Sequence, residues 1–255
     1  MLNSQPKLPE LNKFKKNSIK YIKMMLYTSI LWIANSHAAI SINGTRVIYP
    51  SQKNEVTVNL INKGDAPVLI QNWIDAGDDK ISSGKMAMPF LVTPPINRVD
   101  PGRGQALRIS YLGTPALPLD KESVFWLNVL EIAAVQQGTD NASHLDIAFR
   151  TRIKLFYRPE TLKGDANRAP ELLQWTAHNN GAVQVLNPTS YYVSLGVVTY
   201  HENGKSHETE GKMIAPGETQ KYRFKNISTT NDIHKLSYTA INDYGGVTTY
   251  KAGKK

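Results

Sequence analysis

One run of alternating apolar and polar residues, from Leu145 to Pro159, is much longer than an ordinary strand. One face of the run carries Leu145, Ile147, Phe149, Thr151, Ile153 and Leu155. The other face carries Asp146, Ala148, Arg150, Arg152 and Lys154. Side chains of a β-strand alternate between two faces, and a typical strand has about five or six residues. The pattern therefore predicts an unusually long strand, apolar on one face and largely cationic on the other.

The rest of the chain shows short β-type runs separated by turn residues, and few windows have helical spacing. The first series consists of TRVIYP, EVTVNLIN, PVLIQNWID, FLVTPPINRVDP, QALRISYL and VFWLNVLEI, and it ends with the long strand. A connector rich in Lys, Gly, Asp, Asn and Pro follows Pro159, and then come GAVQVLNPTSYYVSLGVVTY, KMIAPGETQKYRF and KLSYTAINDYGGV. Short strands at this spacing favour β-sandwiches. We predict an all-β protein with two immunoglobulin-like sandwich domains, residues 39–160 and 161–255.

The first 38 residues are typical of a secretory signal peptide. A lysine-rich segment precedes the apolar run 24–34, and Ser36 and Ala38 place small residues where a signal peptidase reads them. The apolar run is shorter than the about 20 residues that span a bilayer. The alternative is a buried helix at a domain edge. We predict that residues 1–38 are removed, that the mature chain begins at Ala39, and that it is exported.

Charge and cysteine content add little to this picture. Six lysines and one glutamate within residues 1–38 account for +5 of the formal net charge of +9, so the predicted mature chain keeps +4. The sequence shows no basic stripe with interleaved aromatic residues, which is the pattern that would indicate nucleic-acid binding. The chain has no cysteine, so its stability has to come from packed cores, which a chain of this length can form.

The sequence offers no motif for catalysis or metal binding. It lacks HExxH, a P-loop, a dinucleotide fingerprint and the G-x-S-x-G elbow. The six histidines are scattered, and we expect His144 and His178 to lie solvated in turns. We therefore expect no enzyme activity, no cofactor and no metal. An exported hydrolase on a β scaffold remains an alternative that requires a clustered nucleophile and base.

Seven motifs, taken together and in order, resemble the PapD-like periplasmic chaperones of the chaperone–usher pathway, which assemble pili and related surface fibres. The motifs are NGTRVIYP, PPINRVDPGRGQALRI, ESVFWLNVLEI, IAFRTRIKLFYRP, NPTSYYVSL, IAPGETQ and INDYGG. The resemblance extends from about Ile42 to Val247. It implies two sandwiches at an angle with a cleft between them, a periplasmic location, and pilus subunits and an outer-membrane usher as partners.

The resemblance also implies a role for the long strand, which in this family completes a pilin subunit that lacks one strand. Main-chain hydrogen bonds supply affinity that tolerates different subunit sequences, and alternate side chains fill the subunit's groove. The groove-filling residues are then Leu145, Ile147 and Phe149. The alternative is that these three pack inside their own domain. The sequence also leaves open whether the free protein self-associates through this strand.

Two cations match the family pair that binds the carboxylate at the C-terminus of the subunit. They are Arg46 and Lys154, which can hold a carboxylate by charge-assisted hydrogen bonds. The neighbouring hydroxyl of Thr45 is a candidate for an additional contact. The alternative is that both cations are solvated surface charges.

A second charged set, Glu122, Arg158 and Asp243, matches a family network that ties the two domains together. We expect these residues to fix the interdomain geometry rather than to bind the subunit. The alternative function, from another class, is that of a structural fimbrial subunit or adhesin with an immunoglobulin-like fold.

Overall fold

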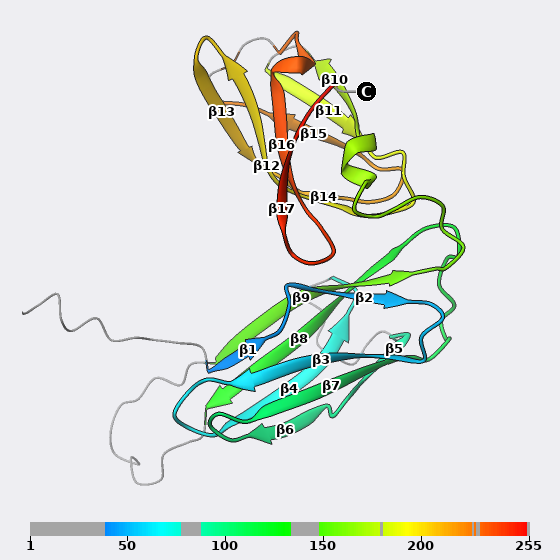
Figure 1. Cartoon of the computed structure of the whole chain (residues 1–255), viewed down its shortest axis with the longest axis vertical. Helices are drawn as coiled ribbons and strands as arrows, with labels where there is room; N and C mark the ends of the chain where they lie inside the picture. Colours follow the sequence, from blue (N-terminus) through cyan, green and yellow to red (C-terminus); the bar gives the residue numbers. More distant parts are fainter. Residues whose placement is uncertain are drawn as a thin grey trace, which may run out of the picture. The chain divides into compact units, whose positions relative to one another are not determined.

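The computed structural model describes residues 39–77, 88–133, 148–178, 181–225, 227 and 230–253 (Figure 1). The predicted signal peptide, Leu145, Ile147 and His144 lie outside these ranges. Among the described residues, no helix has the length and hydrophobicity that crossing a membrane requires.

The first sandwich consists of two sheets. One sheet has the strand order β1-β3-β7-β5, with β1 Ile40–Ile42, β3 Glu55–Asn62, β7 Gly104–Tyr111 and β5 Phe90–Thr93. The other has the order β2-β9-β8-β4-β6, with β2 Arg46–Pro50, β9 Ala148–Arg158, β8 Ser123–Ala133, β4 Val68–Asp75 and β6 Ile96–Val99. All pairs in these two sheets are antiparallel except β2 with β9, which is parallel.

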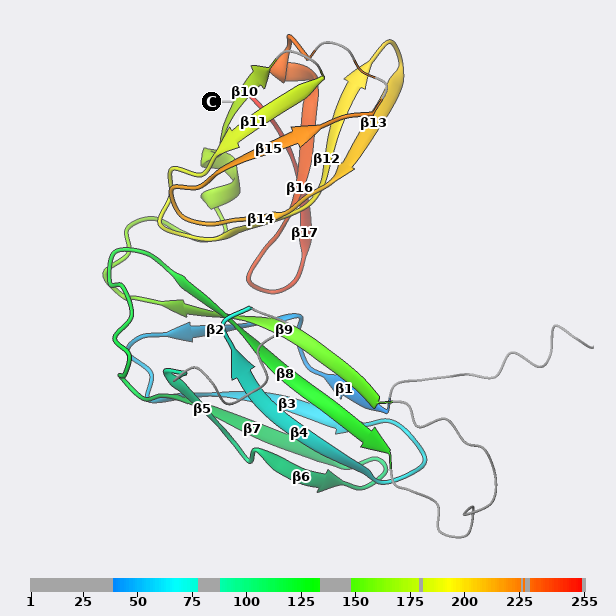
Figure 2. The same ribbon diagram turned by 180° about the vertical axis from the view of Figure 1, so that it is seen from behind.

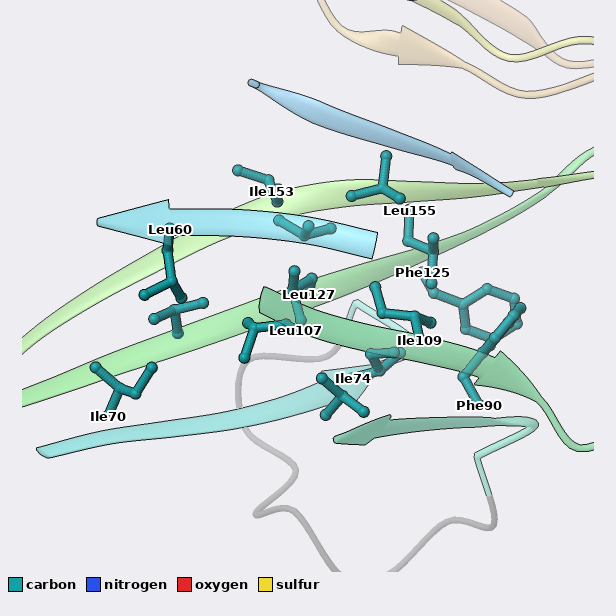
Figure 3. Close-up of a cluster of buried hydrophobic side chains, with 14 of the residues drawn as sticks. Leu60, Ile70, Ile74, Phe90, Leu107, Ile109, Phe125, Leu127, Ile153 and Leu155 are labelled. Atoms are coloured by element: carbon teal, nitrogen blue, oxygen red, sulfur yellow. The ribbon is translucent and has the colours of Figure 1, made fainter. Parts of the chain in front are cut away.

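Alternate residues of these strands form the core between the two sheets (Figure 3). Leu107 on β7 is fully buried, as are Leu127 on β8 and Leu155 on β9. Burying one such side chain contributes about 1.5–3 kcal/mol. On β9, Ile153, Leu155 and Tyr157 therefore face the core. The residues that alternate with them face away from it.

The second sandwich has its own core. A three-stranded sheet contains β10 Gln174–His178, β11 Ala182–Leu186 and β15 Thr219–Arg223. A five-stranded sheet contains β13 Lys205–Glu210, β12 Val193–Glu202, β16 Leu236–Ile241, β17 Val247–Lys251 and β14 Met213–Ile214. The 3-10 helices η1 (Ala169–Leu172) and η2 (Ile233–Lys235) complete it. Its buried cluster includes Trp175, Val185, Tyr200, Ile214 and Leu236 and shares no residue with the first core.

The prediction of an all-β protein with two sandwiches is confirmed, with local corrections. His178 does not lie in a turn: it is the last residue of β10, with an exposed side chain. The predicted connector is partly structural, because Ala169 of η1 is fully buried in the second core. The run FLVTPPINRVDP forms two strands in different sheets, β5 and β6, since Pro94 and Pro95 lack the N–H groups that a continuous ladder needs.

Candidate functional site

The two cations predicted to bind a carboxylate lie side by side. Arg46 and Lys154 are register partners in the parallel β2–β9 pair, and Figures 1 and 2 both show β2 running beside β9. Leu155 and Tyr157, two residues apart on β9, pack in the first core. Since side chains alternate along a strand, Lys154 lies on the outward face of the sheet, opposite to the core.

Both cations contact the second sandwich. The Nζ of Lys154 donates a hydrogen bond to Oγ of Ser194 on β12, at 3.2 Å. The Nη1 of Arg46 donates to the backbone carbonyl of Ile241, at the end of β16, at 2.9 Å. Phe156 is buried, and the guanidinium of Arg46 lies over its ring with 5.8 Å from Cζ to the ring centroid. The pair is therefore held in place from both sandwiches.

The electrostatics of this pair favour an anion. In the part of the chain that the structure describes, neither Arg46 nor Lys154 forms an ion pair. Burial and the charge of Arg46 lower the pKa of Lys154. Burial also lowers the pKa of Arg46, against the opposing charges of Asp243 and Glu122. Two partly desolvated like charges without a counter-ion gain free energy when a carboxylate arrives.

The predicted charge network is assembled around Arg158. Its Nε lies 2.6 Å from Oε1 of Glu122, and its Nη1 and Nη2 lie 2.7 and 3.0 Å from the two carboxylate oxygens of Asp243. Asp243 belongs to the turn between β16 and β17, so the network joins the two sandwiches. Glu122, 2% exposed, also accepts the backbone N–H of Tyr192 on Oε2 at 2.8 Å.

Burial dominates the ionisation of Glu122. It raises the pKa of this carboxyl even though the charge of Arg158 and the amide of Tyr192 act to lower it. For Arg158, burial acts to lower the pKa, but the hydrogen bonds with Asp243 and the charge of Glu122 outweigh it, and the pKa is raised. The guanidinium is thus the group that compensates a buried carboxylate.

The tip of the β16–β17 turn approaches Thr45. Gly245 has φ +83°, and a Cβ placed on it would lie 2.5 Å from Oγ1 of Thr45. Thr45 therefore contacts the second sandwich, and its proposed hydroxyl contact with a bound carboxylate stays a prediction.

We expect Gly245→Ala to weaken the contact between the two sandwiches. The added methyl group strains the left-handed backbone by about 1–2 kcal/mol and also displaces Thr45. Gly217→Ala is the matched control, because Gly217 has φ +73° with no atom within 4 Å of an added Cβ. Thermal unfolding should show a larger loss for Gly245→Ala, which Thr45→Ala in the same chain partly restores. Equal losses in the two alanine variants would mean that the Thr45 contact contributes nothing.

The first half of the long strand lies beyond its parallel partner. The ladder from β2 covers Lys154 to Arg158 and ends there, whereas the ladder with β8 continues to Ala148. On the core-facing side, exposure rises along this half: Ile153 is 8% exposed and Phe149 is 44% exposed. Phe149 is therefore not part of the first core, and its groove-filling role stays a prediction. Leu145 and Ile147, for which the same groove-filling role is predicted, lie outside the described residues.

The cationic face of the strand is partly neutralised by a partner that the sequence analysis did not identify. The Nη2 of Arg152 lies 2.6 Å from Oδ1 of Asp75 on β4, and its guanidinium stacks over Trp126 with 4.9 Å to the ring centroid. Burial acts to raise the pKa of Asp75, but hydrogen bonds from Arg152, Gly77 and Asn128 lower it.

Sequence reasoning also missed Ser194 and the amide of Tyr192, although both lie in the motif NPTSYYVSL. Their roles depend on how the two sandwiches meet, so residue type alone gives no signal. No group of three or more His, Asp or Glu side chains that could hold a metal ion occurs in the described ranges.

Comparison with known proteins identifies the family. Residues 39–163 match the family described as "Pili and flagellar-assembly chaperone, PapD N-terminal domain", and residues 168–252 match "Pili assembly chaperone PapD, C-terminal domain". The probable fimbrial chaperone YadV of Escherichia coli K12 is 42% identical over 86% of this chain and 91% of the relative. The chaperone protein FimB/FhaD of Bordetella pertussis is 42% identical over 85% of this chain and 88% of the relative.

Solved structures agree with these relatives. The crystal structure of the YadV chaperone matches with a TM-score of 0.73 and 40% identity, over 84% of this chain and 99% of that one. The SafB chaperone of Salmonella enterica, solved in complex with the SafA pilin, matches with a TM-score of 0.70 and 26% identity, over 86% and 98% of the two chains. Both sandwiches are covered by the family and by its relatives, and the chain belongs to the PapD-like family of pilus-assembly chaperones.

Proposed function

We propose that this chain is a periplasmic chaperone that binds pilus subunits by lending them the first half of β9 and delivers them to an outer-membrane usher. One observation carries the proposal. A half-exposed Phe149 lies on a strand whose parallel partner stops at Lys154, where two cations lack a counter-ion among the described residues. A guest strand has both an edge to extend and an anchor at its end.

The proposed carboxylate anchor implies a direction for the guest strand. β2 occupies the edge of β9 from Lys154 onward and runs parallel to it. A guest whose terminal carboxylate reaches Arg46 and Lys154 must end where β2 begins. Its last residues then lie along Ala148 to Ile153, parallel to β9 and in line with β2. The anchor also sets the register, since a shift of one residue turns every side chain to the other face.

The other parts of the proposal rest on the sequence. Residues 1–38 are proposed to be the signal peptide, and the two domains are proposed to divide between residues 160 and 161. The pilus subunits, the usher, the periplasmic location and self-association of the free protein follow from the family resemblance. The alternative of a structural fimbrial subunit or adhesin has no described feature in its favour, and relatives that match both sandwiches carry chaperone names.

The proposal is tested by co-expressing the chain with a pilin-like subunit and purifying the periplasmic complex, which we expect to contain one copy of each protein. Phe149→Asp should lower the yield of this complex by about tenfold to a hundredfold, because a buried aromatic side chain contributes about 1.5–3 kcal/mol. The stability of the free protein should change little, since Phe149 is exposed.

The matched control is Leu91→Asp. Leu91 is another exposed apolar residue, but it lies on β5 in the opposite sheet. Its replacement should leave the complex intact. A complex that survives Phe149→Asp, or that both variants weaken equally, would contradict strand lending through β9.

A further inference from the structure

The first sandwich contains a buried carboxylate that is hydrogen-bonded only to backbone amides in the described contacts. Glu131 on β8 is 9% exposed and lies on the same face as Leu127 and Val129, which are core residues. Within the described ranges it makes no ion pair. A buried charge of this kind is unfavourable unless it is paired and hydrogen-bonded. The position therefore calls for a compensating group.

The groups that face this carboxylate belong to the beginning of the predicted mature chain. Oε1 of Glu131 accepts the backbone N–H of Ala39 at 3.2 Å, and Oε2 accepts that of Ile40 at 3.0 Å. These two residues are 92 and 91 positions away from Glu131 in the sequence. Both donors are neutral amides while the preceding residue is attached.

Ala39 is held in this place from its other sides as well. Its carbonyl accepts the N–H of Lys63 at 2.6 Å. Its Cβ lies against Gly64, where an added Cβ would come within 2.8 Å. Ile40, the next residue, is buried and pairs with Asn62 of β3. The nitrogen of Ala39 is thus positioned at the carboxylate by a small side chain and a fixed backbone.

We propose that Glu131 is a binding site for the α-ammonium group that forms on Ala39 when residues 1–38 are removed. Hydrolysis of the Ala38–Ala39 peptide bond by a signal peptidase consumes one water molecule and leaves a carboxylate on Ala38 and an amine on Ala39. This amine, with an ordinary pKa of about 7.7–8.0, takes up a proton at neutral pH. The neutral amide contact becomes an ion pair, and processing stabilises the first sandwich. The inference does not depend on subunit binding.

The test compares two forms of the chain in two backgrounds. One form begins at Ala39 after secretion, which mass spectrometry of the purified protein verifies. The other carries a Gly-Ser extension before Ala39, which leaves an amide at this nitrogen. Each form is made with the native Glu131 and with Glu131→Gln, and thermal unfolding is measured at pH 7. The exposed carboxylate of Glu55 supplies the control Glu55→Gln.

We expect the extension to lower the melting temperature of the chain with the native Glu131 by several degrees and to have little effect in the Glu131→Gln variant. The Glu55→Gln control should behave like the wild type. Equal losses from the extension in both backgrounds, or a secreted chain that begins at another residue, would overturn the proposal.

A second measurement keeps the test decisive if Glu131→Gln does not fold. The α-amine of the secreted chain is acetylated with a limiting amount of an amine-reactive ester near pH 7. Pairing with Glu131 should slow this reaction about tenfold for each unit by which the pKa of the amine is raised, relative to the same chain unfolded in urea. An equal rate in the folded and unfolded chains contradicts the ion pair.

Discussion

Lys154→Ala is expected to lower the affinity for the C-terminal segment of a pilus subunit by roughly thirty-fold to several thousand-fold. Truncating one member of a hydrogen-bonded charge pair in a desolvated interface costs about 2–5 kcal/mol. The free protein should be as stable as the wild type or slightly more stable, because burial and the charge of Arg46 already lower the pKa of Lys154. Loss of binding without loss of stability separates an anchor from a structural residue.

The measurement is the binding of a fluorescent peptide with the sequence of the subunit's last strand, made with a free carboxylate and with a C-terminal amide. Wild-type protein should discriminate strongly between the two, and Lys154→Ala should bind both weakly and nearly equally. Lys163→Ala removes an exposed lysine of the connector and serves as the charge-matched control. Discrimination that persists in Lys154→Ala would assign the carboxylate to another site.

The prediction of Arg46 and Lys154 as an anchor rests on the family resemblance of the motifs in which they lie, and their role stays a prediction. Arg46 follows NGT, and Lys154 lies within the long strand. The parallel pairing that makes them register partners could not be read from the sequence. The same holds for Ser194, 40 residues from Lys154 in the chain, which holds its ammonium. Residue type identifies candidate ligands, whereas the folded chain determines what positions them.

Alternation also failed where strands lack apolar residues or change sheets. β13 has the sequence KSHETE, which shows no apolar face and was not predicted. The run around Pro94 reads as one strand, but the chain crosses from one sheet to the other there. The contact of Glu131 with Ala39 has no sequence signal either, since a lone glutamate in VLEIA is ordinarily placed on a solvated face.

Arg158→Ala should be the most destabilising of the substitutions considered. It leaves Glu122, which is 2% exposed, without its cation. Removing one partner of a buried ion pair costs about 3–5 kcal/mol, which for a chain of this size lowers the melting temperature by about 6–20 °C. Circular dichroism gives the melting temperature, and small-angle scattering reports whether the distance between the two sandwiches changes.

An exposed ion pair provides the control. Arg98 lies 2.9 Å from Asp100 with its side chain 68% exposed, and Arg98→Ala should change the stability by no more than about 0.5 kcal/mol. If Arg158→Ala keeps the stability and the scattering profile of the wild type, the charge network does not fix the interdomain geometry.

The double variant Glu122→Gln with Arg158→Ala separates two explanations of that loss. If the loss arises from an uncompensated buried charge, replacing Glu122 by a neutral amide recovers part of it, because the amide oxygen of the new side chain can still accept the N–H of Tyr192. If the loss arises from the missing link to Asp243, the double variant stays as unstable as Arg158→Ala. Burial raises the pKa of Glu122, so the carboxylate is already disfavoured in the native state, and we expect partial recovery. Partial recovery would mean that the guanidinium acts chiefly to make a buried carboxylate tolerable where the two sandwiches meet.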